Sequence, residues 1–226
     1  MRKASRARLL WDLFAFPYSV QDCQRNTEAQ ISRFLGILSR LGEKGIKFRK
    51  VHMANSDAIN NFPITYSSVF NHVRTGINLY GSFDNEGKRV LKLESVLSLK
   101  TRLVAVRKLP AGMSLGYGCT YKLLKDTLVG TIAAGYADGL PLALSSRGYV
   151  LINNTLCPIL GRISMDYTAV SLENVPGVKA GDEVICLGGE GINAISVENW
   201  AQIKGTHSYD VICSFGSRVK RNYING

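Results

Sequence analysis

Two short segments combine polar side chains with the end of a predicted strand. His52-Met-Ala-Asn-Ser56 lies where a strand ends and a helix begins, and Arg74-Thr-Gly76-Ile77 repeats this arrangement one strand later. In α/β barrels this carboxyl-end face binds ligands, and a helix N-terminus there offers free backbone N–H groups to an anion. A glycine at position 76 lets the backbone approach a phosphate closely. Together the segments predict anion binding, although each alone is also compatible with an ordinary loop.

Two further segments place charged and aromatic groups between predicted strands. In Gly135-Tyr136-Ala-Asp138-Gly139 a phenol and a carboxylate stand between glycines, directly after an apolar strand. This favours polar groups at the rim of a sheet, or a turn whose aspartate bonds its own backbone. Gly161-Arg162-Ile-Ser-Met165-Asp166 is a similar polar break, for which a bulge with a surface ion pair is the simpler interpretation.

The predicted helices and strands that position these segments divide into two kinds. Up to about residue 95, helix and strand signals alternate: a helix from Asn26 or Thr27 to Gly42 or Gly45, a strand over 48–53, a helix from 55, and a strand over 71–74. This order is typical of parallel α/β units. A closed eight-fold barrel needs at least about 200 residues, so only part of one is expected here.

From about Leu97 the pattern becomes all-β. Strands are predicted over 97–106, 128–133, 148–152, 167–172, 182–187 and 210–215, with a weak helix over 197–203. Strands separated by Gly, Pro and Asn turns indicate an antiparallel barrel or sandwich. We therefore expect two domains, 1–95 with a partial α/β barrel and 96–226 with a β domain, joined near residues 90 to 97.

Composition restricts the class of protein. The chain has 226 residues, 46% of them hydrophobic, which is enough for a packed core. Its net charge of +11 comes mainly from scattered residues without a nucleic-acid-binding signature, so neither a nucleic-acid partner nor a membrane span is expected. The basic start is interpreted as an irregular leader, not a secretory signal. The cysteines are odd in number, unpaired in spacing and partly inside apolar runs, which predicts a cytoplasmic chain without disulfides or a metal site: Cys23, Cys119, Cys157, Cys186 and Cys213.

Taken together, these segments resemble the alanine racemase family, from about Thr27 to Tyr223. The resemblance implies a pyridoxal 5'-phosphate cofactor in an α/β barrel followed by a β domain. The segments that carry it occur in the family order: His52–Ser56, Val73–Gly81, Gly116–Tyr121, Ala134–Pro141, Pro158–Asp166, Pro176–Glu183 and Ser217–Arg221.

The resemblance implies a role for each matched residue. Tyr136 matches a tyrosine base that works opposite a cofactor-binding lysine and enters the active site of the partner subunit, which implies a homodimer. Arg74 matches the arginine at the pyridine nitrogen and His52 its support. The other matches are phosphate contacts (Ser56, Gly76, Ile77), a substrate-carboxylate contact through the Met165 backbone, and residues at or near the entrance (Arg162, Asp166).

Two departures from the family qualify these roles. Ser217 stands where many members carry a tyrosine that touches the phosphate and narrows the entrance. The lysine motif is not found, and residues 1 to about 20 match poorly, so we expect a chain without the family's front half and with little activity alone.

The expected activity is interconversion of L-alanine and D-alanine by two bases, which supplies D-alanine for peptidoglycan. Two alternatives stay open. One is a serine racemase of the vancomycin-resistance kind, with which the change at Ser217 is compatible. The other is a non-enzymatic remnant whose β domain only binds a partner.

Overall fold

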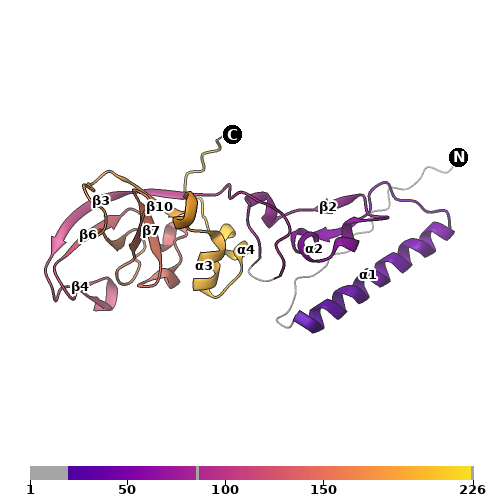
Figure 1. The fold of residues 1–226 in the computed structure, drawn as a ribbon, viewed down its shortest axis with the longest axis horizontal. Helices are drawn as coiled ribbons and strands as arrows, with labels where there is room; N and C mark the ends of the chain where they lie inside the picture. The colour runs from indigo at the N-terminus through magenta and orange to yellow at the C-terminus, as the bar shows by residue number, and fades with distance from the viewer. Residues whose placement is uncertain (1–19, 85–86, 225–226) are drawn as a thin grey trace. The chain divides into compact units, whose positions relative to one another are not determined.

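The computed structural model describes residues 20–84 and 87–224 (Figure 1). The expectations for the basic leader therefore lie outside the described residues, as does the environment of the Cys23 side chain. Within the described part, no helix combines the length and the apolar composition that crossing a bilayer requires. The chain divides into two compact units, Met1–Leu79 with Glu86–Lys92 and Tyr80–Asn85 with Leu93–Gly226.

The first unit begins with the long helix α1 (Val20–Glu43). Its apolar face buries Ile31 and Phe34 against Met53 and Ala58, and the rings of Phe34 and Phe70 stack 6.0 Å apart. The predicted end near Gly42 or Gly45 is confirmed, because Gly45 adopts the left-handed φ of a helix terminus. The predicted start was wrong: the helix begins at Val20, ahead of the polar residues that suggested a cap.

Next comes a small parallel sheet of β1 (His52–Asn55) and β2 (His72–Arg74). Between them lies α2 (Ser56–Asn61), capped by the Asn55 side chain, which accepts a bond from the Ala58 N–H. The parallel α/β arrangement and the helix start are confirmed. The first strand lies later than the predicted 48–53, and short 3₁₀ turns, η1 (Pro63–Tyr66) and η2 (Ile77–Tyr80), follow the elements.

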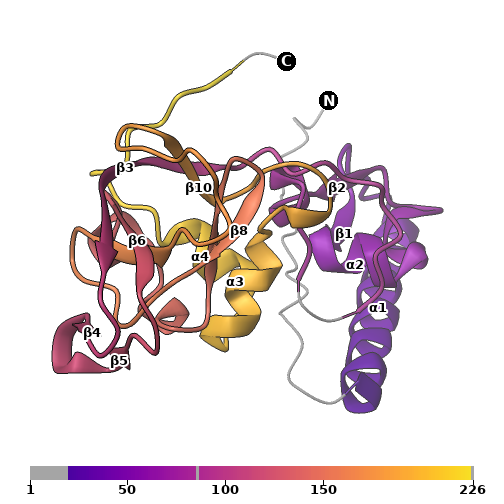
Figure 2. The same cartoon turned by 60° about the vertical axis from the view of Figure 1, so that its left-hand side comes forward.

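The second unit is built on one antiparallel sheet (Figure 2). Its strands are β3 (Leu99–Leu109), β6 (Thr127–Ile132), β7 (Tyr149–Ile152), β8 (Thr155–Pro158), β9 (Thr168–Ser171) and β10 (Glu183–Leu187), in the order β8-β7-β10-β3-β6-β9. A bridge between Ile159 and Val170 joins the two outer strands, so the sheet nearly closes into a barrel. The predicted antiparallel β domain is confirmed. A separate hairpin pairs β4 (Ser114–Leu115) with β5 (Tyr121–Lys122).

Two helices complete this unit. The predicted helix over 197–203 is confirmed as α3 (Val197–Lys204), which buries Trp200 completely. The predicted last strand, 210–215, was wrong, because the segment forms α4 (Ser208–Cys213). His207 caps this helix by accepting a bond from the Asp210 N–H. Cys213 consequently lies exposed at the helix end, whereas Cys157 and Cys186 are buried in the core as expected. Burial raises the pKa of the Cys157 thiol to about 11.

Candidate functional site

The two predicted anion-binding segments meet in the first unit. Ser56 opens α2 directly after β1, and the loop after β2 brings Gly76 to it: the Gly76 N–H donates to Ser56 Oγ at 2.7 Å. The N–H of Asn78 donates to the same oxygen at 3.5 Å. Ser56 is buried, and because a hydroxyl offers two acceptor positions and one donor, these two bonds use its acceptor positions and not its O–H. Ile77 begins η2, and the N–H groups of a helix's first turn have no partner within that helix.

Arg74 and His52 come from the two paired strands of the same unit. Arg74 is half-buried and is the register partner of Asn55, and its Nη2 lies 3.5 Å from the Met53 carbonyl oxygen. His52 is half-buried at the other end of the pairing, opposite His72. The sheet therefore places the guanidinium at the strand end that also carries Ser56.

In the second unit, the loop of Tyr136 is fixed by its backbone. Tyr136 opens the short turn η4 (Tyr136–Asp138), and its N–H donates to the Ser164 carbonyl at 3.0 Å. The next N–H donates to the Met165 carbonyl at 3.1 Å. Gly135 permits this contact, since a Cβ there would lie 2.3 Å from both carbonyl oxygens. Tyr136 remains 45% exposed and Met165 51%, so the loop lies at the surface and not in the core.

An ion-pair network ties this loop to the polar break that follows β8. Asp138 accepts a bond from the Gly135 N–H at 3.0 Å, which confirms the predicted aspartate turn. Arg218 lies 3.4 Å from the other oxygen of Asp138 and donates to Asp166 at 2.7 Å. The hydrogen bond with Asp166, and then the charge of Asp138, raise the pKa of Arg218. The surface ion pair predicted for Asp166 therefore exists, with Arg218 as its partner.

Arg218 had no predicted role, although it stands inside a matched segment. Its partners lie 52 and 80 positions earlier in the chain, so no local pattern could reveal the pairing. Arg162 is exposed, and its backbone packs so closely on Gly116 that a Cβ there would lie 2.6 Å from the Arg162 nitrogen. Ser217 is exposed beside Arg218.

Comparison with known proteins decides the family. The family model described as "Alanine racemase, C-terminal domain" matches residues 96–223, and that described as "Alanine racemase, N-terminal domain" matches residues 4–84. The chain belongs to the alanine racemase family. The match to the family's N-terminal domain begins at residue 4, which corrects the expectation that residues 1 to about 20 differ from the family.

Individual racemases agree with this assignment. The alanine racemase of Desulforamulus reducens is 42% identical over 200 residues, which are 88% of this chain and 52% of the relative. The solved alanine racemase of Clostridium difficile 630 has a TM-score of 0.80 at 31% identity. The match covers 88% of this chain and 52% of the chain of that racemase. That of Bacillus anthracis with bound L-Ala-P has a TM-score of 0.72 at 34% identity, over 85% and 49% of the two chains. The chain thus spans about half the length of the relatives it matches.

Proposed function

We propose that this protein is a pyridoxal 5'-phosphate-dependent alanine racemase that interconverts L-alanine and D-alanine. The observation that carries the proposal is the exposed phenol of Tyr136 on a loop held by two backbone bonds beside Met165. A phenol fixed at the surface can reach a substrate, whereas a buried one could not. The bound L-Ala-P in the relative from Bacillus anthracis supports an alanine-like ligand.

The first unit fits the phosphate of the cofactor. Ser56 retains an O–H donor, Gly76 is exposed beside it with its own N–H bonded to Ser56 Oγ, and Ile77 begins a helical turn. Hydroxyl and backbone N–H donors of this kind hold a phosphate. Arg74 would face the pyridine nitrogen, with His52 supporting it. Because a guanidinium cannot release its proton at neutral pH, Arg74 would donate a hydrogen bond there without transferring a proton.

Tyr136 would act as one of two bases. When bound, pyridoxal phosphate supplies an electron sink that makes the α-proton of an amino acid acidic. The phenol Oη of Tyr136 would take or return that proton on one face of the substrate. The opposite face would be served by the family's cofactor-binding lysine, whose motif is not found in this sequence. A phenol with an ordinary pKa of about 10 needs nearby positive charge or hydrogen bonds to act as a base at neutral pH. The backbone N–H groups of the Met165 segment would orient the substrate carboxylate.

We further propose a homodimer in which Tyr136 serves the active site of a neighbouring copy. Tyr136, Met165 and Tyr167 expose 45%, 51% and 53% of their surfaces and come from one hydrogen-bonded pair of loops. Aromatic and methionine side chains that gather at a surface are typical of interfaces. In this arrangement Arg162, Asp166 and Ser217 would stand near the substrate entrance, and the product D-alanine would supply peptidoglycan.

Racemisation of L-alanine by the full-length gene product with added pyridoxal phosphate tests the proposal, with chiral chromatography as the readout. Tyr136→Phe removes the oxygen that takes the proton in one direction and returns it in the other, so we expect racemisation in both directions to slow about 10²- to 10⁴-fold. A higher turnover of L-serine than of L-alanine would point to the serine alternative. Turnover of neither amino acid would favour the non-enzymatic alternative.

A further inference from the structure

A buried amide lies directly behind the Ser56–Gly76 contact. Asn60, on the last turn of α2, is only 5% exposed. Its Nδ2 donates to the Ser56 carbonyl at 2.8 Å and to Asn78 Oδ1 at 3.3 Å. Its Oδ1 accepts a bond from the Val90 N–H at 3.1 Å. Both ends of this amide are therefore used, and they face different segments of the first unit.

The donor end of Asn60 contacts Ser56, which is proposed to hold phosphate, and Asn78, which directly follows the other two proposed phosphate contacts, Gly76 and Ile77. One of its bonds fixes the carbonyl of Ser56, and the other fixes the side chain of Asn78. The N–H of Asn78 and that of Gly76 both point to Ser56 Oγ. The position of the Ser56 hydroxyl thus depends on Gly76 and Asn78, and the position of Asn78 depends on Asn60.

The acceptor end of Asn60 holds residues 87–92, which we name the strap and which belong to the same unit. The neighbouring Asn61 supports the strap independently: its Oδ1 accepts a bond from the Lys88 N–H at 2.8 Å, and its Nδ2 donates to the Asp57 carbonyl at 3.0 Å. Adjacent asparagines therefore both bind the strap, but only Asn60 also bonds to the Ser56 backbone and to Asn78.

We infer that Asn60 is a positioning residue, which holds Ser56, Gly76 and Asn78 in a phosphate-binding arrangement and links them to the strap. The ligand identity in this inference rests on the proposed function. The arrangement requires two donors and an acceptor on one small planar group, which an asparagine supplies. An aspartate has the same shape and keeps the acceptor for Val90, but it would turn carboxylate oxygens toward the Ser56 carbonyl and Asn78 Oδ1. Asn60→Asp therefore removes the donor contacts and keeps the acceptor, and it also adds a buried acidic group, so exchange measured without an anionic ligand separates loss of positioning from charge repulsion.

Binding of two matched probes separates positioning from general stabilisation. Pyridoxine 5'-phosphate and pyridoxine differ only in the phosphate, and neither has an aldehyde that reacts with surface lysines. For Asn60→Asp in the full chain, we expect the Kd of pyridoxine 5'-phosphate to rise roughly tenfold and that of pyridoxine to change less than about twofold. Asn61→Ala, the control, should leave the ratio of the two constants unchanged. Equal weakening of both probes, or no change in either, would overturn the inference.

Amide hydrogen exchange without any ligand gives the second measurement. Asn60→Asp should speed exchange roughly tenfold at Gly76 and Asn78 while leaving Val90 nearly unchanged, whereas Asn61→Ala should speed exchange at Lys88 alone. Such a pattern would support the positioning role even if the unaltered protein failed to bind pyridoxine 5'-phosphate, a failure that would count against the proposed cofactor. Unchanged exchange at Gly76 and Asn78 in a folded Asn60→Asp protein would refute the role. Should Asn60→Asp not fold, Asn60→Ser tests exchange at Gly76 and Asn78 alone, because its shorter hydroxyl cannot span both donor contacts.

Discussion

The two units hold their proposed functional residues in different ways. In the second unit, the Tyr136 loop is bonded through its backbone to a segment that rests on a nearly closed sheet with a large apolar core. In the described part of the first unit, the apolar cluster is small, and side chains such as Ser56, Asn60 and Asn61 make the bonds that connect its loops.

This difference predicts which kinds of substitution destabilise each unit. A backbone contact on a packed sheet tolerates most side-chain changes but not an added atom at the contact itself. A buried side-chain network fails when one donor is lost, because the remaining groups are left buried without partners. We therefore expect the second unit to respond to changes of volume and the first to changes of hydrogen-bonding chemistry.

The largest effect should come from Trp200→Ala in α3. Trp200 is fully buried, and its ring lies 6.3 Å from that of Phe215. Loss of such a side chain creates a cavity and costs about 3–5 kcal/mol. We expect the free energy of unfolding of the second unit to fall by this amount, as measured by a urea titration followed by circular dichroism.

Trp200→Phe is the matched control. The Trp200 Nε1 is buried with no hydrogen-bond partner among the described residues, so a phenylalanine removes a buried unpaired donor along with part of the ring. Its cost should be clearly below that of Trp200→Ala. Equal costs for the two variants would show that the volume of the side chain does not determine the stability of this core.

Gly135→Ala tests the backbone contact beneath Tyr136. The added Cβ would lie 2.3 Å from the carbonyl oxygens of Ser164 and Met165, so the loop must move. We expect a destabilisation of about 1–3 kcal/mol, as for other overpacked sites, and, if the proposed function holds, a loss of racemisation in the full-length gene product. Gly216→Ala, with open space around its Cβ, is the control and should be nearly neutral. Normal activity in Gly135→Ala would mean that the position of this loop is not required.

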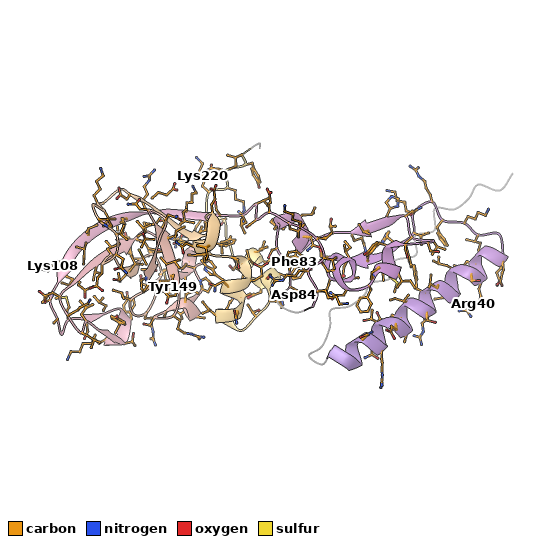
Figure 3. All side chains as sticks on the ribbon, viewed as in Figure 1. Arg40, Phe83, Asp84, Lys108, Tyr149 and Lys220 are labelled. Atoms are coloured by element: carbon orange, nitrogen blue, oxygen red, sulfur yellow. The ribbon has the colours of Figure 1, made fainter. Side chains whose placement is uncertain are left out.

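The carboxylate of Glu198 should make the stability of the second unit depend on pH. Its carboxylate accepts bonds from the Ser82 hydroxyl at 2.6 Å and from the N–H of Phe83 (labelled in Figure 3) at 2.9 Å. Burial raises the pKa of Glu198, but these hydrogen bonds outweigh it and hold the pKa below its ordinary value of 4.5. Its stabilisation is therefore complete above the unfolded pKa and is lost as the pH falls through the lower folded pKa.

Glu198→Gln should remove part of this dependence. Glutamine keeps one acceptor oxygen but no charge, so we expect a loss of about 1 kcal/mol at pH 7 and less below pH ~4. Chemical unfolding at several pH values measures both. Glu183→Gln, in an exposed pair with Lys100, is the control and should cost less. A loss that stays constant across this pH range would contradict the assignment.

Sequence periodicity predicted most strands of the second unit well, but it missed one strand and misassigned one helix. Strands β6, β7, β9 and β10 match their predicted ranges closely, because apolar residues alternate between turn residues. Strand β8 was missed, although Asn153 and Asn154 before it both adopt the positive φ of a tight hairpin turn. That pair was a usable signal. The error at α4 had another cause: a short apolar run does not distinguish a strand from a helix, and the cap that decides comes from His207.

The site could be predicted only where its parts are local. Ser56 and Gly76 stand at strand ends, and Tyr136 and Asp138 stand between glycines, so each was visible in the sequence. Asn60 and Arg218 were not, because each connects segments that the fold brings together. Asn60 reaches residues 18 and 30 positions away. Contacts of this kind follow from tertiary structure and leave no periodic pattern.

The smallest effect should be a gain of stability in the first unit. Gly36 lies inside α1, and a Cβ added there meets nothing within 4 Å. Glycine in a helix interior costs roughly 0.5–1 kcal/mol relative to alanine, since it loses more conformational freedom on folding. Gly36→Ala should therefore stabilise this unit by that amount in a denaturant titration. Gly45→Ala, at a φ of 72° where alanine is strained, should do the opposite. If both were neutral, the stability of the first unit would depend on its buried polar network and not on the helix, which sharpens the contrast with the apolar core of the second.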